Sequence, residues 1–143
     1  MRKYLIATHG TFAKGIHSSL EIIMGTPENV FLLQAYTGEN KSIKEELDTV
    51  LEKISKEDEL IVFTDLMGGS VTNQILQYAL KKNVYIISGL NLPLLLDILL
   101  ADQEIPVNEV IETGINNAKD QIVFVNKLIT SNKENINDQN DTY

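Results

Sequence analysis

The sequence contains no cysteine, and this absence removes several kinds of chemistry at once. A chain without cysteine has no disulfide framework, no thiolate metal site and no cysteine nucleophile. A cytoplasmic location is therefore the default expectation.

An excess of positive charge is also missing. Twelve lysines and arginines stand against 20 aspartates and glutamates, which gives a formal net charge of −8. Nucleic-acid binding needs a basic surface, and the lysines here are scattered among acidic residues. We therefore exclude nucleic acid as a partner.

Long hydrophobic runs are missing as well. The longest, LNLPLLLDILLA at residues 90–101, is interrupted by Asn91, Pro93 and Asp97 and is too short to span a bilayer. The apolar run near the N-terminus is too brief for the core of a signal peptide. The sequence therefore predicts neither a membrane span nor a secretion signal.

Short apolar runs alternate with segments of helical periodicity, a pattern typical of an α/β protein with a mostly parallel sheet. A chain of 143 residues fits one domain, which we expect over residues 1–130, with a polar, flexible tail over 131–143. Expected strands cover residues 3–8, 30–36, 59–64, 84–88 and 121–125. Helices are expected over 11–24, 43–54, 70–79, from 91 onward and within 107–119, with Ser42, Ser70 and Asn91 as candidate caps.

Three polar, glycine-containing loops follow expected strands. They are THG at residues 8–10, DLMGGS at 65–70 and GLNLP at 89–93. The carboxyl ends of parallel strands meet at one edge of the sheet, where ligands of such folds bind. If the first and third strands are neighbours, His9 and Asp65 come side by side.

A histidine beside a carboxylate can act as a nucleophile. The carboxylate accepts the Nδ1 proton, leaves the Nε2 lone pair free, and stabilises the cation that forms when Nε2 gains a group. Gly68, Gly69 and Ser70 offer backbone N–H groups and a hydroxyl suited to an anion such as a phosphoryl group. Gly10 leaves room for a partner to approach His9.

Other phosphate-binding and metal-binding motifs are absent. The sequence contains no P-loop, no GxGxxG, no HExxH and no carboxylate cluster, so we expect no metal and no cofactor. The remaining features fit a histidine that receives its phosphoryl group from another protein. The plain alternatives are a solvated loop histidine and a simple strand–helix turn. His17 is in the middle of an expected helix, one turn before Glu21, and is interpreted as structural or solvated.

Four ordered motifs, IATHGTFAKG, ENVFLLQAYTGEN, VFTDLMGGSVTNQ and ISGLNLPLLLDIL, make the chain resemble a known family. It is similar to the enzyme IIA component of the mannose class of the bacterial phosphoenolpyruvate-dependent sugar phosphotransferase system. The resemblance extends over about residues 2–128.

The resemblance implies a cytoplasmic phosphocarrier that can associate with the membrane through its transporter. Such a protein takes a phosphoryl group from phospho-HPr onto a histidine, here His9, oriented by an aspartate, here Asp65. It passes the group to enzyme IIB, which phosphorylates sugar delivered by the membrane IIC and IID components. Gly68, Gly69 and Ser70 would hold the phosphoryl group, and the rim of the site would comprise Thr8, Gly10, Leu66, Met67 and Asn91.

The resemblance also implies a sheet of four parallel strands with helices on both faces and one C-terminal antiparallel strand, QIVFV, exchanged in a homodimer. One departure is visible: Val71 and Thr72 follow Ser70, where family members often have proline and an aromatic residue. The alternatives are the phosphotransfer subunit of a dihydroxyacetone kinase, a regulator that senses sugar flux, and a small-ligand binding module. The sugar is chosen by the membrane subunits, so the sequence does not name it.

Overall fold

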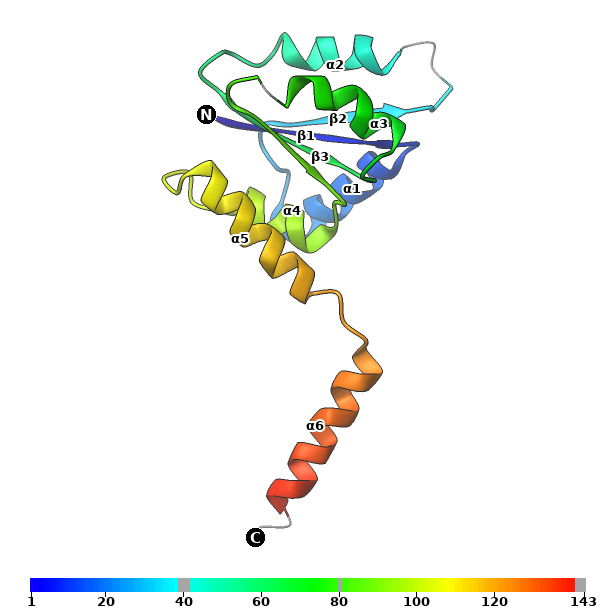
Figure 1. Cartoon of the computed structure of the whole chain (residues 1–143), viewed down its shortest axis with the longest axis vertical. Helices are drawn as coiled ribbons and strands as arrows, with labels where there is room; N and C mark the ends of the chain where they lie inside the picture. Colours follow the sequence, from blue (N-terminus) through cyan, green and yellow to red (C-terminus); the bar gives the residue numbers. More distant parts are fainter. Residues whose placement is uncertain (39–41, 80, 141–143) are drawn as a thin grey trace.

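The structure of the chain is a computed structural model that describes residues 1–38, 42–79 and 81–140, with residues 133–140 described by their backbone only. Strands and helices alternate along the first 88 residues, and three helices follow (Figure 1). The elements are β1 (Arg2–His9), α1 (Phe12–Met24), β2 (Val30–Ala35), α2 (Ile43–Leu51), β3 (Glu59–Thr64), α3 (Ser70–Ile75), the 3₁₀ turn η1 (Leu76–Tyr78), β4 (Val84–Ser88), α4 (Leu92–Leu99), α5 (Val107–Asp120) and α6 (Val125–Asn140).

The four strands form one parallel sheet in the order β2-β1-β3-β4. The expected neighbourhood of the first and third strands is therefore confirmed. Ala7 of β1 is paired with Thr64 of β3, and His9 is paired with Ala35 of β2. This register brings the residues that follow β1, β2 and β3 to the same edge of the sheet.

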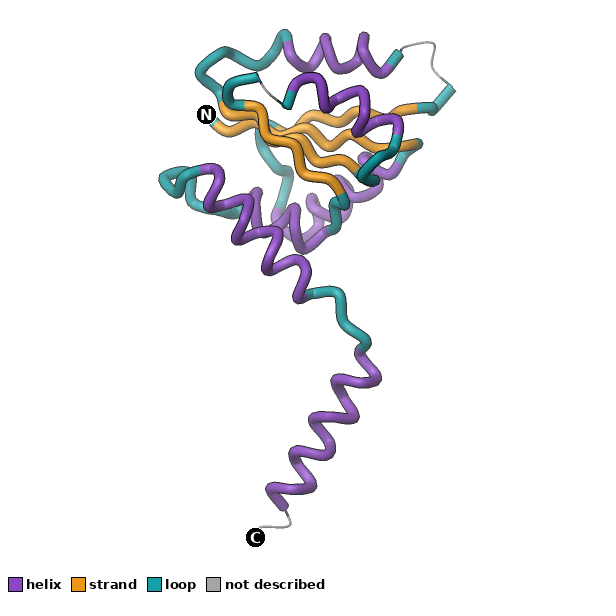
Figure 2. The backbone as a smooth tube through the Cα atoms, in the orientation of Figure 1, coloured by secondary structure: helices purple, strands orange, loops and turns teal. Residues whose placement is uncertain are grey.

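Helices cover both faces of the sheet, as expected. Helices α2 and α3 lie over one face, and α1, α4 and α5 lie over the other (Figures 1 and 2). The strands are buried between these layers, so their side chains alternate between two cores. In β1, Leu5 and Ala7 face the α2–α3 side, whereas Tyr4 and Ile6 face the α1–α4–α5 side.

Two of the three predicted N-cap side chains are confirmed. The Ser42 hydroxyl accepts the N–H of Glu45 at the start of α2, and the Asn91 side chain accepts the N–H of Leu94 at the start of α4. The expectation that Ser70 caps α3 is wrong. Gly69 is the N-cap residue, and the Ser70 side chain makes no capping hydrogen bond.

The expected antiparallel strand at residues 121–125 is not formed in the single chain. Gln121 is the C-cap residue of α5, residues 122–124 form a loop, and Val125 begins α6. The chain leads away from the sheet after α5 (Figure 1), and a strand cannot form without a hydrogen-bonded neighbour. Exchange of this segment between two subunits stays a prediction.

The domain limit at residue 130 also stays a prediction, because α6 runs through it, and residues 141–143 of the expected tail lie outside the described residues. In the part of the chain that the structure describes, no helix has the length and apolar character needed to cross a membrane.

Candidate functional site

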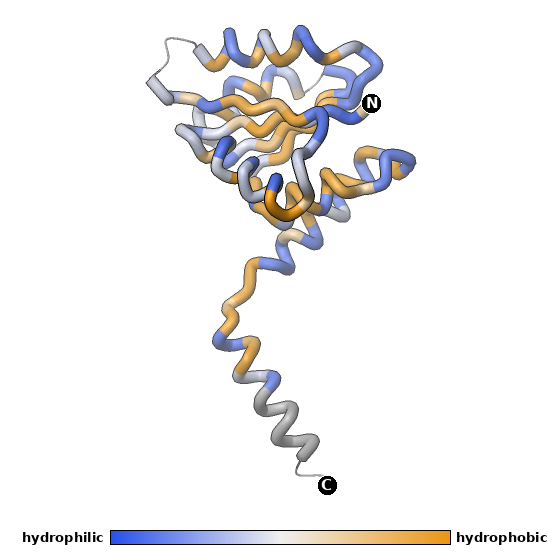
Figure 3. The backbone as a smooth tube through the Cα atoms, turned by 180° about the vertical axis from the view of Figure 1, so that it is seen from behind, coloured by the Kyte–Doolittle hydropathy of each residue, from blue (hydrophilic) through white to orange (hydrophobic). Residues whose placement is uncertain are grey.

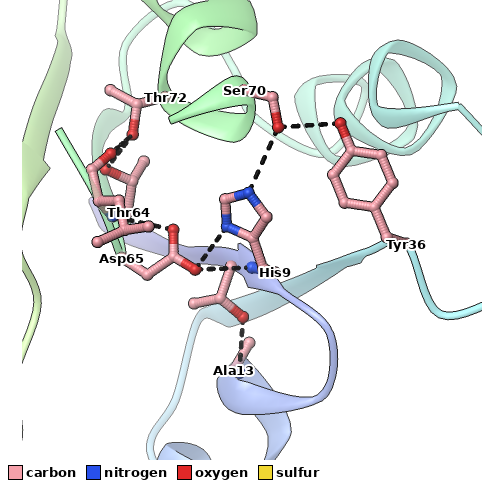
Figure 4. Close-up of polar contacts among 9 residues, drawn as sticks. His9, Ala13, Tyr36, Thr64, Asp65, Ser70 and Thr72 are labelled. Carbon is pink, nitrogen blue, oxygen red and sulfur yellow. Dashed lines mark hydrogen bonds and ion pairs between the residues drawn. The ribbon is translucent and has the colours of Figure 1, made fainter. Parts of the chain in front are cut away.

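His9 lies at the end of β1, where the chain turns sharply into α1. Gly10 adopts a φ of +57°, which favours glycine, and its N–H donates to the carbonyl of Ala35 at 2.7 Å. The buried Thr8 hydroxyl accepts the N–H of Ala13 at 2.8 Å (Figure 4). These two bonds fix the turn on both sides of His9, so its backbone position is rigidly defined.

Asp65 follows β3 directly and receives three hydrogen bonds (Figure 4). Its Oδ2 accepts the His9 backbone N–H and contacts His9 Nδ1, both at 2.8 Å. Its Oδ1 accepts the N–H of Leu66 at 3.0 Å. The predicted pairing of His9 with Asp65 is therefore present in the structure. Two contacts from the backbone and ring of one residue hold the imidazole in a single orientation.

The charge state of Asp65 follows from these contacts. Burial of its side chain, which is 11% exposed, would raise the pKa of the carboxyl. Hydrogen bonds from the His9 backbone and ring outweigh burial and hold the pKa below its usual value of 3.8. Asp65 is thus a carboxylate at neutral pH and can only accept, so a neutral His9 carries its proton on Nδ1 and presents an unprotonated Nε2.

Ser70 faces this Nε2. Its Oγ lies 3.3 Å from Nε2, because Ser70 is the first residue of α3 and its side chain points back toward β1 (Figure 4). Gly68 has a φ of +75°, and a Cβ on Gly69 would stand 3.4 Å from His9 Cε1. Of the three residues that were expected to bind an anion, Gly69 and Ser70 therefore lie beside the imidazole, and Gly68 shapes the loop that leads to them.

Tyr36 belongs to the site and was missed by the sequence analysis. Its ring stacks on His9 with a centroid distance of 5.7 Å and an interplanar angle of 25°. Its hydroxyl donates to Ser70 Oγ at 2.9 Å. Tyr36 stands within the motif ENVFLLQAYTGEN, directly after β2, and the strand order places this end of β2 beside His9. Tyr36 could therefore be assigned to the site only once the strand order was known.

A buried hydroxyl pair supports the loop that carries Asp65. Thr72 Oγ1 donates to the carbonyl of Leu66 at 2.5 Å and lies 2.8 Å from Thr64 Oγ1 (Figure 4). Thr72 has one hydroxyl proton, so the Thr64 hydroxyl donates to Thr72. Thr72 is one of the two residues, with Val71, at which the sequence analysis noted a departure, and its hydroxyl connects α3 to the loop after β3.

The expected rim residues divide into three groups. Leu66 and Met67 are 59% and 76% exposed on the loop that carries Asp65. Thr8 and Gly10 hold the turn and do not form an open rim, since Thr8 is buried. The Asn91 side chain is used to cap α4. No described contact joins it to the imidazole.

The second histidine lies apart from this cluster. His17 Nδ1 is 2.8 Å from Oε1 of Glu21, one turn along α1, in agreement with a structural or solvated role. Within the described residues, no three histidine, aspartate or glutamate side chains gather in a way that could hold a metal ion.

The chain was compared with known proteins. A family model described as "PTS system fructose IIA component" matches residues 3–115. The mannose-specific EIIAB component of Escherichia coli K12 is 30% identical over 122 residues, which are 80% of this chain but 38% of that protein. The fructose-specific EIIA component of Bacillus subtilis is 26% identical over 121 residues, 83% of this chain and 80% of that protein.

Solved structures give the same result. A crystal structure from Klebsiella pneumoniae, assigned to a permease of the phosphoenolpyruvate-dependent sugar phosphotransferase system, superposes with a TM-score of 0.85 at 34% identity, over 90% of this chain and 93% of that one. The phosphotransferase component EIIA of Streptococcus agalactiae superposes with a TM-score of 0.73 at 28% identity, over 89% and 99% of the two chains. The chain belongs to the mannose-class EIIA family of the sugar phosphotransferase system.

Proposed function

We propose that this protein is a phosphocarrier that accepts a phosphoryl group from phospho-HPr on Nε2 of His9 and donates it to enzyme IIB. The observation that carries the proposal is the pairing of Asp65 with Nδ1, which leaves Nε2 as an accessible nucleophile beside Ser70. The His9 side chain is 37% exposed. Enzyme IIB would serve the membrane IIC and IID components, so the protein would work in the cytoplasm, in part associated with the membrane.

The proposed transfer needs no proton movement. The Nε2 lone pair attacks phosphorus, the new N–P bond forms, and the bond from phosphorus to the donor atom breaks with its electron pair leaving on the donor. The positive charge that develops on the imidazole is stabilised by Asp65 through Nδ1–H. In the second transfer a nucleophile of enzyme IIB attacks phosphorus, and the N–P electron pair returns to Nε2.

The loop between β3 and α3 would hold the phosphoryl oxygens. Ser70 Oγ already lies at hydrogen-bond distance from Nε2, so its hydroxyl can turn to an oxygen of the attached group. Gly69 has no side chain to fill the space beside His9 Cε1, and Gly68 supplies the positive φ that the loop requires. These residues are proposed as the anion-binding part of the site.

The surroundings of His9 favour a macromolecular donor over a small molecule. A cavity of about 690 Å³ lies between α4 and α5, and one of about 450 Å³ lies along β4, but His9 lines neither of them. Leu66 and Met67 instead expose apolar side chains directly beside Asp65. Exposed apolar residues around an open nucleophile are suited to docking of a protein partner.

Transfer of label from phosphoenolpyruvate tests the proposal. The protein is incubated with enzyme I, HPr and labelled phosphoenolpyruvate, and acid-labile label is measured on the chain. We expect His9→Ala to take up no label and His17→Ala to take up as much as the wild type. Uptake of label by His9→Ala together with loss of uptake in His17→Ala would show that His17, and not His9, is the phosphorylated histidine.

A homodimer is part of the same proposal. β4 is an edge strand of the sheet, and the loop after α5 exposes Ile122, Val123 and Phe124 by 78%, 51% and 72%. This apolar segment is visible between α5 and α6 in Figure 3. An unpaired edge and an exposed β-prone segment both invite association, and exchange between two subunits would cover them together. Light scattering should give twice the mass of the chain, and a stable monomer at micromolar concentration would contradict the exchange.

A further inference from the structure

Tyr36 is held in an unusual way for an exposed aromatic side chain. Its backbone has a φ of +62°, a conformation that is uncommon for bulky residues. The residue is 67% exposed, yet its ring lies on the His9 imidazole and its hydroxyl reaches Ser70 (Figure 4). One side chain therefore contacts both the nucleophile and the hydroxyl that faces it.

A chain of hydrogen bonds runs from Tyr36 through Ser70 and His9 to Asp65. When His9 is neutral, each bond in this chain has only one possible donor. The Asp65 carboxylate accepts from Nδ1–H, so Nε2 can only accept, and Ser70 must donate its single proton to Nε2. Ser70 Oγ then accepts the proton of the Tyr36 hydroxyl. Tyr36 thus donates to the lone pairs of Ser70 Oγ and leaves the single Ser70 proton for Nε2.

This direction matters once Nε2 carries a phosphoryl group. The lone pair of Nε2 is then used in the N–P bond, so the Ser70 hydroxyl loses its acceptor. The nearest new acceptors are the phosphoryl oxygens on the same nitrogen, and charge-assisted hydrogen bonds to them are stronger than neutral ones. With Tyr36 still donating to it, Ser70 keeps its own proton directed at the phosphoryl group.

We propose that Tyr36 is a positioning residue of the phosphohistidine site: its ring orients His9 and its hydroxyl directs Ser70 toward the phosphoryl group. The inference rests on the proposed function of His9. Tyr36 directly follows β2 and belongs to none of the segments that carry His9, Asp65 and Ser70. The proposal therefore adds a residue to the site.

Two substitutions separate the contributions of the ring and the hydroxyl. Tyr36→Phe removes only the hydroxyl, and Tyr36→Leu removes the stacked ring as well. Tyr85→Phe is the matched control, since it deletes a tyrosine hydroxyl from β4, outside the site. Potassium phosphoramidate serves as a small donor, so that binding of a protein partner does not enter the measurement. Nε2 displaces ammonia from it, the N–P bond to the ring forming as the bond to the leaving nitrogen breaks.

The lifetime of the phosphohistidine is followed by phosphorus NMR, together with the rate of its formation at saturating phosphoramidate. We expect Tyr36→Phe to form the phosphohistidine roughly three- to tenfold more slowly, as expected for loss of one neutral hydrogen bond, with an unchanged donor KM. Tyr36→Leu should be slower again, and Tyr85→Phe should match the wild type. The urea midpoint of Tyr36→Phe should be unchanged, because the hydroxyl is exposed.

A rate and lifetime for Tyr36→Phe within twofold of the wild type would overturn the inference. A loss that appears in the donor KM alone would overturn it too, because positioning acts on the transfer step. Failure of the wild type to form any phosphohistidine on His9 with phospho-HPr as the donor would instead refute the proposed function, so the two failures are distinguishable.

Discussion

Replacement of Asp65 by asparagine is the sharpest test of the site, because it keeps the shape of the side chain and removes its charge. The carboxylate accepts the backbone N–H and the ring Nδ1–H of His9 on Oδ2, and the N–H of Leu66 on Oδ1. An amide has one oxygen. If that oxygen faces His9, the amide NH₂ opposes the N–H of Leu66, and one hydrogen bond is lost. If the NH₂ faces His9 instead, it favours the tautomer in which the proton moves to Nε2, which then cannot attack.

The expected loss of rate follows from the charge that develops during transfer. Removal of one charge-assisted hydrogen bond costs about 1.5–3 kcal/mol, and a unit charge at 4 Å contributes about 4 kcal/mol near a protein surface. His9 is more than one-third exposed, so solvent screens part of this interaction. We therefore expect a barrier higher by about 1–4 kcal/mol, or a loss on the order of 10–10³ in the rate of phosphotransfer.

Single-turnover transfer from phospho-HPr measures the rate, and ¹⁵N chemical shifts of the His9 ring report the tautomer. Asp97→Asn is the matched control, because Asp97 is a carboxylate on α4 that accepts a hydrogen bond from Asn117 and lies outside the site. We expect Asp97→Asn to transfer at the wild-type rate. A transfer rate for Asp65→Asn within twofold of the wild type, with unchanged ring shifts, would show that the carboxylate does not act on His9.

Three further predictions concern stability. Thr72→Val should lower the free energy of unfolding by about 1–3 kcal/mol in urea titration, since it removes the partner of the buried Thr64 hydroxyl and of the partly buried Leu66 carbonyl, whereas Thr72→Ser should recover most of the loss. Gly114→Ala should cost about 1–3 kcal/mol, because its Cβ would stand 2.8 Å from a side-chain carbon of α4, whereas Gly15→Ala, with open space around it, should not destabilise the protein. Hydrogen bonds from the Lys3 side chain and the Ser55 backbone hold the pKa of Asp58 far below its usual 3.8, so its contribution to stability is present above pH 3.8 and is lost as the pH falls below it. The difference in stability between the wild type and Asp58→Asn should therefore shrink on acidification, and a difference that grows would contradict this assignment.

The sequence by itself determined the elements that depend on near neighbours in the chain. Short apolar runs predicted the four strands of the sheet, and helical periodicity predicted the first five helices. The caps at Ser42 and Asn91 were predictable because a capping side chain and the backbone N–H that donates to it are three residues apart. The pairing of His9 with Asp65 was also predictable, because His9 ends β1, Asp65 directly follows β3, and the carboxyl ends of parallel strands share an edge.

Only the tertiary structure decided the contacts that depend on strand order and side-chain direction. Tyr36 reaches His9 because β2 lies beside β1, and no spacing in the sequence encodes that neighbourhood. Ser70 carries a typical capping side chain, but Gly69 is the N-cap residue of α3, and Ser70 Oγ lies 3.3 Å from Nε2 of His9 instead. The segment at residues 121–125 has the composition of a strand, but the single chain offers it no neighbour, since α5 leads it away from the sheet and the backbone enters α6. Local periodicity fixes what a segment can become, whereas the hydrogen-bonding partners available around it fix what it is.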